Sequence, residues 1–424
     1  MSPALNSDVL SYGEAATLIA THVSTLARLR HPVEHVSLVR SAGRVLARAL
    51  RADQDQPPFA RSTRDGFACC AADASTHEPL ALTGATKAGA APSGSVARRS
   101  AWEIMTGAPV PGGADAVVML EHVEVVNGLV RLLPPRTIAP GENIVAKAAQ
   151  ARKGDELLPA GTLIGAAQIA LAAACGAATL EVFRKPRVAI LATGDELVRV
   201  NQTPAPGQIR NSNAPMLAAM VAAFGGNPWV LPIVRDTEKA LDAAIAKTAG
   251  VDLLLFSGGV SAGKFDLVEP SLARIGARFH FTAVRIQPGK PTVFGEVPTR
   301  GGGSKLPKDK NRTTYLLGLP GNPVSSAVTF HLFAAPILRA LAGSRDTRPR
   351  FALAQLAEDV KAKPGLTRFL PAACKFSSNT PEVAIVSWQG SGDIAAMARA
   401  NCFLVIPDDA DRLNAGSIVR ILLF

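Results

Sequence analysis

The sequence predicts a multidomain α/β protein that combines one helix-covered parallel sheet with β-rich segments. The chain has 424 residues, which suits about two to four domains. Strand-like and helix-like apolar runs alternate from Pro186 to Leu341, as in a parallel sheet with helices on both faces. Short apolar runs separated by turn residues precede and follow that segment, and they are typical of β-rich domains.

The N-terminal segment begins with a helix predicted over Ser11–Leu29, where apolar residues recur at helical spacing. Ser11 is placed to cap this helix, with Glu14 three residues later as its capping-box partner. A second, alanine-rich helix is predicted over Leu163–Cys175.

The segment from Gln54 to Pro140 is predicted to be mostly β. Short apolar runs are separated there by turn signals such as Pro111-Gly112-Gly113. Asn127-Gly128 lies between two strand-like runs, which is a strong hairpin signal.

The alternating segment supplies the predicted sheet, with strands that end in polar or glycine-rich loops. Its expected strands are Arg187–Leu191, Trp229–Val234, Asp252–Phe256 and Tyr315–Leu319, and its expected helices are Pro215–Phe224, Glu238–Ala249, Leu267–Ile275 and Val324–Leu341.

The last 75 or so residues form a further predicted β-rich domain after a polar linker. Its strand-like runs are Val383–Trp388, Cys402–Ile406 and Ile418–Phe424. The low-complexity basic segment Arg300–Arg312 is predicted to be a flexible surface loop.

Composition narrows the class of protein. The net charge of +11 would attract anionic partners, but aromatic residues do not cluster with Lys and Arg as they do in single-strand binders, so nucleic acid is disfavoured. The five cysteines form no C-x-x-C motif, which disfavours zinc-finger and disulfide frameworks. No basic-then-apolar signal segment is seen, and the longest apolar run is broken by Gly165, Gln168 and Gly176. We therefore expect a cytoplasmic protein without a membrane segment.

Ligands of open parallel sheets bind beyond the carboxyl ends of the strands, and three expected strands end there in glycine-rich loops. Glycines allow backbone N–H groups to approach an anion, and a helix N-terminus adds partial positive charge. Turns also need glycine, so each loop alone is weak support; three together favour a phosphate or polyanion site. The expected ligand-binding residues of these loops are Thr193, Gly194, Asp195, Ser257, Gly258, Gly259, Ser261, Pro320, Gly321, Asn322 and Pro323.

Carboxylates stand in or beside the same loops, where they would repel a phosphate unless a divalent cation lies between. Mg²⁺ typically takes one or two carboxylates plus phosphate oxygens. Asp236 and Asp266 precede expected helices, so each could equally be a cap; with Glu196 they suggest a metal site. Lys290, between Gly289 and Pro291, is an expected anion clamp.

The motifs together resemble those of the molybdopterin molybdenumtransferase family, which includes the matching domains of gephyrin and its plant relatives. Their order and spacing along most of the chain make the resemblance specific. The motifs are TRDGFA (63–68), MTGAPVP (105–111), GEN (141–143), LPAGT (158–162), TGDEL (193–197), RNSNAPML (210–217), SGGVS (257–261), PGKP (288–291) and GLPGNPVSS (318–326).

The resemblance implies an elongated homodimer of four-domain subunits. Its active site would lie between the α/β domain of one subunit and the inserted β domain of the other. The expected boundaries are a split N-terminal domain at 1–50 and 141–184, an inserted β-rich domain at 51–140, a molybdopterin-binding α/β domain at 185–343 and a C-terminal β domain at 348–424.

The resemblance also implies a reaction in which adenylylated molybdopterin and molybdate are consumed and AMP is released, with Mg²⁺ assisting. A molybdoenzyme or another cofactor-biosynthesis protein would be a candidate partner. By position, Asp65, Thr106, Glu196, Asp236 and Asp266 match the family's functional residues, and all of them except Thr106 are expected metal ligands. Lys290 and Ser391 match positions near the molybdate and phosphate groups.

Four positions depart from the family pattern where it handles metal or oxyanion: Gln150, Ala283, Gln287 and Pro371. Arg368 or Arg285 is available to replace the lost cations. Three functions follow: an active transferase with a reshaped anion site; a paralogue that binds molybdopterin or the finished cofactor as a carrier, chaperone or regulator; and a scaffold for protein interactions.

Overall fold

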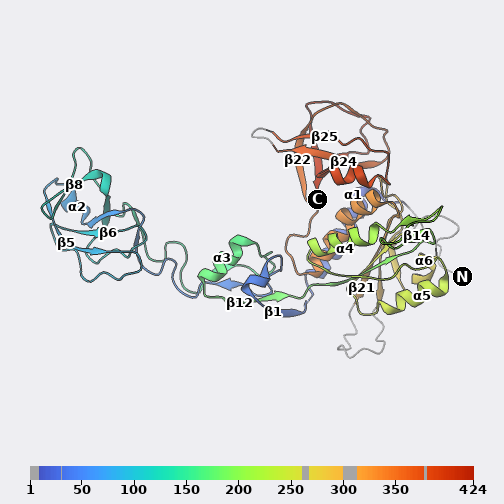
Figure 1. Cartoon of the computed structure of the whole chain (residues 1–424), viewed down its shortest axis with the longest axis horizontal. Coiled ribbons are helices and arrows are strands. Elements are labelled where there is room, and N and C mark those ends of the chain that lie inside the picture. The colour runs from blue at the N-terminus through green and yellow to red at the C-terminus, as the bar shows by residue number, and fades with distance from the viewer. Residues whose placement is uncertain (1–8, 30, 260–266, 299–312, 377–379) are drawn as a thin grey trace.

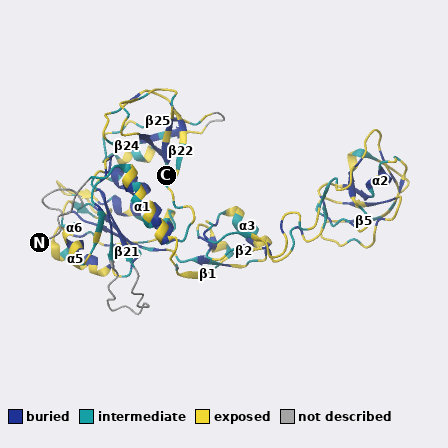
Figure 2. Cartoon of the chain, turned by 180° about the vertical axis from the view of Figure 1, so that it is seen from behind, coloured by how far each residue is buried: buried dark blue, intermediate teal, exposed yellow. Residues whose placement is uncertain are grey.

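The computed structural model describes residues 9–29, 31–259, 267–298, 313–376 and 380–424. The chain is elongated, with a β-rich unit at one end, a small mixed unit in the middle, and a helix-covered sheet beside a second β-rich unit at the other end (Figure 1). Each of these parts has its own buried residues (Figure 2). The fold class expected from the sequence, including the elongated shape, is confirmed.

The α/β part is built on a six-stranded sheet of order β16-β13-β17-β21-β20-β18. The first four strands are parallel, as expected, but β20 and β18 extend the sheet antiparallel. The expected parallel sheet is therefore a mixed one. Its strands are β13 (Arg187–Ala192), β16 (Asn227–Val230), β17 (Leu253–Ser257), β18 (Arg278–Phe281), β20 (Val293–Pro298) and β21 (Thr313–Leu319), and a short parallel pair, β14 (Leu197–Val198) and β15 (Ile209–Arg210), lies beside it.

Helices α4 (Asn213–Ala223), α5 (Glu238–Lys247) and α6 (Val268–Arg274) follow the parallel strands along the chain, as the alternation predicted. The last expected helix is continuous from α7 (Pro323–Thr329) to α8 (Ala335–Leu341), with a π-helical stretch at Phe330–Ala334 between them. The whole helix Pro323–Leu341 has the length and apolarity of a membrane span, but 89% of its most apolar 18 residues are buried inside the protein. It is the central core helix of this part.

Helix α1 (Tyr12–Leu26) carries the capping box that the sequence predicted. Its buried residues Ala15, Ile19, Val23 and Leu26 belong to the core of the α/β part, and the helix packs against α8. This packing differs from the expected division, which counted the helix with the N-terminal domain. The apolar face of α1 is buried against α8 and the π-helical stretch before it.

The middle unit is formed by two segments distant in sequence, around a core that includes Leu46, Ile164 and Val182. Its elements are β1 (Val33–Ser37) paired with β12 (Thr179–Phe183), β2 (Leu50–Arg51) paired with β11 (Glu156–Leu158), a 3₁₀ turn at Leu38–Ser41, and α3 (Ala166–Ala174).

The β-rich unit at the far end contains a six-stranded sheet of order β7-β4-β6-β5-β9-β8. The predicted hairpin at Asn127-Gly128 joins β8 to β9. Its elements are β3 (Arg61–Ser62), β4 (Gly66–Cys69), α2 (Ala71–Ala74), β5 (Leu80–Thr86), β6 (Ser100–Ile104), β7 (Ala116–Met119), a 3₁₀ turn at Leu120–His122, β8 (Val123–Val126), β9 (Leu129–Leu132) and β10 (Ile144–Val145).

The C-terminal unit is a six-stranded sheet of order β19-β24-β25-β22-β28-β26, whose first strand comes from the α/β segment. Its elements are β19 (Ile286–Gln287), β22 (Phe351–Leu356), β23 (Val360–Lys361), β24 (Thr367–Lys375), β25 (Glu382–Ile385), α9 (Ile394–Arg399), β26 (Cys402–Ile406), β27 (Arg412–Leu413) and β28 (Ile418–Leu423). We propose that the four units are the domains expected from the sequence, with α1 assigned to the third.

Candidate active site

The candidate site lies where the strand order of the α/β sheet reverses. In the sheet, β13 lies between β16 and β17, which are the next two strands of this sheet along the chain. The chain therefore leaves β13 and β17 toward opposite sides, and the loops after these strands diverge and leave a crevice. A cavity of about 650 Å³ occupies this position. It is lined by the loops after β13, β17 and β21, by the start of α4, and by Gly392 and Ile394 of the C-terminal unit.

The loop after β17 turns sharply at two glycines. Gly258 has φ +86° and Gly259 has φ +66°, which L side chains rarely adopt. A Cβ on Gly259 would lie 2.7 Å from Thr193 Oγ1, so glycine is also required for space. The backbone of the loop after β17 therefore lies close to the cavity, which is what the sequence analysis expected of an anion-binding loop.

Among the residues that the structure describes at this cavity, two buried polar atoms have no hydrogen-bond partner: Thr193 Oγ1 and Asn213 Oδ1. Asn213, the first residue of α4, donates from Nδ2 to Ser257 Oγ at 2.8 Å and to the Gly321 carbonyl at 2.7 Å. This amide is fixed by the loops after β17 and β21, while its oxygen is left free. Unpaired buried polar groups are costly and rare, so both atoms are candidate contacts for a polar ligand.

Most of the expected ligand-binding residues of the strand-end loops line the cavity, and Ser391 reaches it through Asn322. Asn322 Nδ2 donates to Ser391 Oγ at 2.8 Å. Those that line it are Thr193, Gly194, Ser257, Gly258, Gly259, Pro320, Gly321, Asn322 and Pro323. Ser261 lies outside the described residues.

The expected acidic residues are only partly brought together. Glu196 and Asp236 line the cavity and are exposed. Asp195 is exposed and does not line it, and its Oδ1 accepts a 3.4 Å hydrogen bond from the Asp236 N–H. Asp266 lies outside the described residues. Two exposed carboxylates beside a polar cavity suit a hydrated divalent cation such as Mg²⁺.

Asp65 and Thr106 form a local pair in the far β-rich unit. Asp65 Oδ1 accepts a 2.6 Å hydrogen bond from the Thr106 N–H, and this N–H, followed by the Thr106 hydroxyl, holds the pKa of Asp65 below its ordinary value. Asp65 immediately precedes β4 and therefore lies at the opposite end of the chain from the cavity (Figure 1). A single chain does not unite this pair with Glu196 and Asp236.

The expected anion clamp at Lys290 is exposed and does not line the cavity. Nearby, Gln287 is held by a cation, because Arg368 Nε donates to Gln287 Oε1 at 2.9 Å. Pro371 is buried within β24. The Gln287 departure is thus accompanied by an arginine on the neighbouring strand β24, which also carries Pro371, and Arg368 rather than Arg285 makes the contact.

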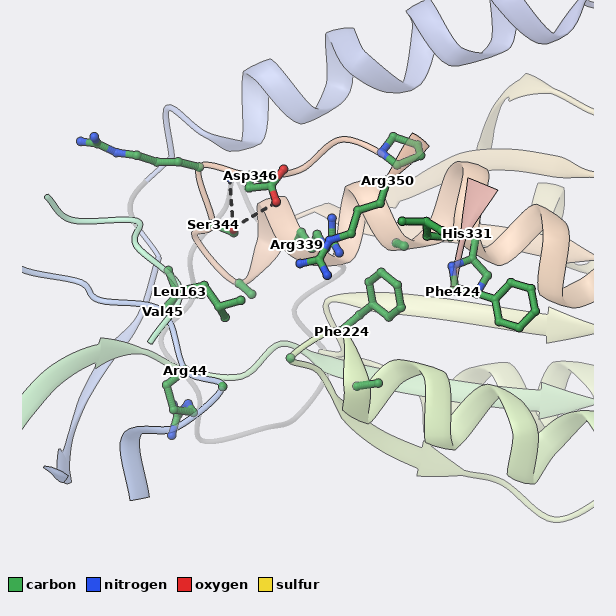
Figure 3. Close-up of a pocket in the computed structure, with 18 of the residues that line it drawn as sticks. Arg44, Val45, Leu163, Phe224, His331, Arg339, Ser344, Asp346, Arg350 and Phe424 are labelled. Atoms are coloured by element: carbon green, nitrogen blue, oxygen red, sulfur yellow. Dashed lines mark hydrogen bonds between the residues drawn. The ribbon is translucent and has the colours of Figure 1, made fainter. Parts of the chain in front are cut away.

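A larger cavity, of about 790 Å³, lies between the middle unit and the α/β part (Figure 3). The Arg339 guanidinium stacks on the Phe224 ring at 4.7 Å there, and burial lowers the pKa of His331 to about 4. None of the expected site residues line it. The cavity at the sheet crevice is therefore the candidate active site.

Comparison with known proteins identifies the family of the chain. Family models match over 10–176 (MoeA N-terminal region, domains I and II), 189–340 (probable molybdopterin binding domain) and 353–424 (MoeA C-terminal region, domain IV). The molybdopterin molybdenumtransferase of a Nostoc species is 34% identical over 397 residues, covering 92% of this chain and 88% of the relative. The chain belongs to the molybdopterin molybdenumtransferase family.

Further relatives support the assignment. The Bacillus subtilis molybdopterin molybdenumtransferase is 34% identical over 401 residues, covering 92% of this chain and 89% of its own length. A solved molybdopterin biosynthesis MoeA protein from Pyrococcus horikoshii OT3 has a TM-score of 0.80 at 26% identity and covers 98% of this chain and 100% of that chain. The family resemblance expected from the motifs is confirmed along nearly the whole chain.

Sequence reasoning missed Asn213 and its neighbour Asn211, which also lines the cavity. Both stand in the RNSNAPML motif, but an Asn at the start of a helix is ordinarily a cap, and Asn211 does accept from the Ala214 N–H at 3.1 Å. The motif's two asparagines in a predicted strand-to-helix loop were the available signal.

Proposed function

We propose that this chain is an active molybdopterin molybdenumtransferase that binds adenylylated molybdopterin in the crevice cavity. The observation that carries this proposal is the pair of buried, unpartnered atoms, Thr193 Oγ1 and Asn213 Oδ1. A pterin nucleotide offers polar ring and phosphate groups that would satisfy them, and a cavity of about 650 Å³ falls in the size range of small-molecule sites.

The chain's own residues have separable tasks in this proposal. The backbone at Gly259 would approach the phosphates, since the Gly258 N–H already donates to the Leu319 carbonyl at 3.2 Å, while Thr193 and Asn213 would orient the ligand. Glu196 and Asp236 would hold Mg²⁺, which when bound would polarise the phosphoanhydride. Water would then attack that bond and release AMP, leaving molybdopterin with its own phosphate. Molybdate would bind the two dithiolene sulfurs, and one of its oxygens would leave as water with the two thiol protons.

The proposed reaction requires a second copy of the chain. Asp65 and Thr106 match functional positions of the family, yet they lie far from the cavity of their own chain (Figure 1). In a homodimer the far β-rich unit of one subunit would reach the cavity of the other. We accordingly propose a homodimer with two composite sites.

We propose that Arg368 supplies the cation that Gln287 lacks. Its guanidinium is partly exposed and keeps donors free beyond its bonds to Gln287 Oε1 and to the Leu366 carbonyl.

All five cysteines are free, which supports the expected cytoplasmic setting.

The test is release of AMP from adenylylated molybdopterin by the purified protein. We expect release that depends on both molybdate and Mg²⁺. Absence of AMP at high molybdate, with pterin binding retained in a direct binding assay, would instead identify a carrier or regulator. Absence of pterin binding would leave only the scaffold function.

A further inference from the structure

A cluster of two histidines and a glutamate lies at the antiparallel edge of the α/β sheet. His22 comes from α1, His280 from β18 and Glu296 from β20. One ligand atom from each lies within 4.8 Å of the other two, and no other group of three His, Cys, Asp or Glu side chains meets this criterion within the described part of the chain. None of the three lines the candidate active site.

The backbone aims these side chains at one another. The pairing of β18 with β20 shifts register between Phe279 and Phe281, so His280 is the extra residue of an irregularity, and such bulges re-aim side chains. The His22 and His280 rings stand 4.3 Å apart between centroids and are tilted by 53°. His280 Nε2 lies 3.8 Å from Glu296 Oε1.

Packing alone does not explain the pair. His280 Nε2 is buried without a hydrogen-bond partner, which costs free energy that a phenylalanine at this position would avoid. The rings rest on Phe294, whose centroid is 5.0 Å from that of His22 and 5.2 Å from that of His280. Converging nitrogens and a carboxylate beside an apolar wall, which limits solvent access, form a surrounding that can hold a metal ion.

We propose that His22, His280 and Glu296 bind a zinc ion that ties helix α1 to the antiparallel edge of the sheet. Two imidazole nitrogens and one carboxylate form a ligand set that Zn²⁺ favours, with the fourth position left to water. Mg²⁺ prefers oxygen ligands and is excluded by the same chemistry. The site is independent of the proposed transferase activity.

The test uses the untagged full-length protein, freed of metal with a chelator and titrated with ZnCl₂ by calorimetry, with MgCl₂ as the control ion. We expect about one zinc ion per chain, a rise in Tm on zinc addition, and no displacement of the bound zinc by Mg²⁺, whose proposed ligands are Glu196 and Asp236. Absorption spectroscopy at the zinc edge should show nitrogen and oxygen neighbours only. Sulfur neighbours, or no zinc binding, would overturn the proposal.

The decisive variants are His22→Phe and His280→Phe, which keep an aromatic ring but remove the ligand nitrogen. Loss of an outer-shell partner alone weakens metal binding by roughly 10- to 100-fold, so we expect at least that loss here. The Tm of the zinc-free His280→Phe variant should be unchanged or higher, because an unpaired buried nitrogen is removed.

The matched control is His35→Phe, which replaces an exposed histidine of β1 and should bind zinc like the unmodified chain. Glu296→Gln gives a second test if a phenylalanine variant folds poorly, since it removes the charged ligand with little change of shape. Zinc affinity unchanged in His280→Phe or in Glu296→Gln would sink the proposal.

Discussion

Thr193 gives the cleanest residue-scale test of the cavity, because its buried hydroxyl has no partner to lose. Thr193→Val keeps the shape and removes only the hydroxyl. We expect the free energy of unfolding to be unchanged or slightly higher, while the KM for adenylylated molybdopterin rises about 5- to 10-fold, as one neutral hydrogen bond of about 1 kcal/mol is lost. Urea unfolding and AMP-release kinetics measure the two effects.

A matched control is Thr83→Val, which removes a hydroxyl of the far β-rich unit that donates to the Ala101 carbonyl at 3.3 Å. Its KM should match that of the unmodified chain. A Thr193→Val enzyme with unchanged KM would show that the orphan hydroxyl does not contact the substrate.

Arg368 carries the prediction about anion handling. Arg368→Gln removes the guanidinium beside Gln287 while leaving a partly exposed position. A charge-assisted contact contributes about 1.5–3 kcal/mol, so the apparent KM for molybdate should rise on the order of 10- to 100-fold. Initial rates of AMP release at varied molybdate measure it.

Arg412 provides the comparison, since it is an arginine of the same C-terminal unit that, like Arg368, does not line the cavity, but its guanidinium pairs with Asp359 rather than with Gln287. Arg412→Gln should leave the molybdate dependence unchanged. Equal molybdate dependence of the Arg368→Gln and unmodified enzymes would assign the missing cation to another residue.

At the scale of single residues, the sequence indicated the strand-end residues that line the cavity, but not Asn213, whose amide joins two of its loops. Thr193, Ser257 and Asn322 follow strands that are plain in the sequence, and parallel strands bring their ends together. The role of Asn213 was not predicted. Its amide bonds both the loop after β17 and the loop after β21, and no pattern in the sequence indicates that these two loops lie within reach of one side chain. Lys290 was expected at the ligand because of its motif, yet it does not line the cavity.

Helix α1 allows a prediction at the scale of an element, through its capping box. Glu14 accepts 2.7 Å hydrogen bonds from the Ser11 N–H and hydroxyl, which hold its pKa below the ordinary value of 4.5. A carboxyl with a lowered folded-state pKa stabilises the fold above the unfolded pKa, and this contribution is lost as pH falls through the folded pKa. The Tm advantage over Glu14→Gln should thus be present at pH 7, begin to fall below the ordinary pKa of 4.5, and vanish below the folded-state pKa, which is lower still.

Thermal scans of both proteins from pH 7 to pH 3 measure this difference, and other titrating groups cancel in the comparison. A gap in Tm that stays constant with pH would mean that the Glu14 charge contributes nothing. Glu382→Gln, at an exposed position of β25, serves as the variant expected to show no such trend.

The sequence predicted best those elements that a single local pattern defines, such as a continuous apolar run or a turn dipeptide. Strands β13, β17 and β21 are continuous apolar runs, and the Asn127-Gly128 turn fixes its hairpin. The antiparallel direction of β18 and β20 was not predictable, because the period of a strand does not reveal its direction. The π-helical stretch at Phe330–Ala334 likewise leaves no mark on an apolar helix pattern.

At the scale of the whole molecule, what the sequence could not show is which units share a core. The middle unit joins segments more than a hundred residues apart, as in the pairing of Val33 with Phe183. Helix α1, by contrast, leaves its sequence neighbours and packs on α8. Local patterns predict that a face will be buried, but only the folded chain decides its partner.

The elongated shape leads to the last prediction, which concerns the homodimer. If the cavity of one subunit is completed by the far β-rich unit of the other, Asp65→Asn and Glu196→Gln chains should each be inactive as homodimers. After mixing under conditions that exchange subunits, each heterodimer contains one intact site and one with both changes. Activity should recover to about a quarter of the unmodified level at equal mixing.

The measurement is AMP release before and after exchange, with light scattering to establish the dimer. Mixing two preparations of the Asp65→Asn chain, treated in the same way, controls for reactivation by the exchange itself. Recovery in the mixed sample alone requires that Asp65 and Glu196 act across two chains, because no single chain in that mixture carries both. A mixture as inactive as its components would mean that Asp65 and Glu196 act within one chain. The chain would then have to bend so that its far β-rich unit reaches its own cavity.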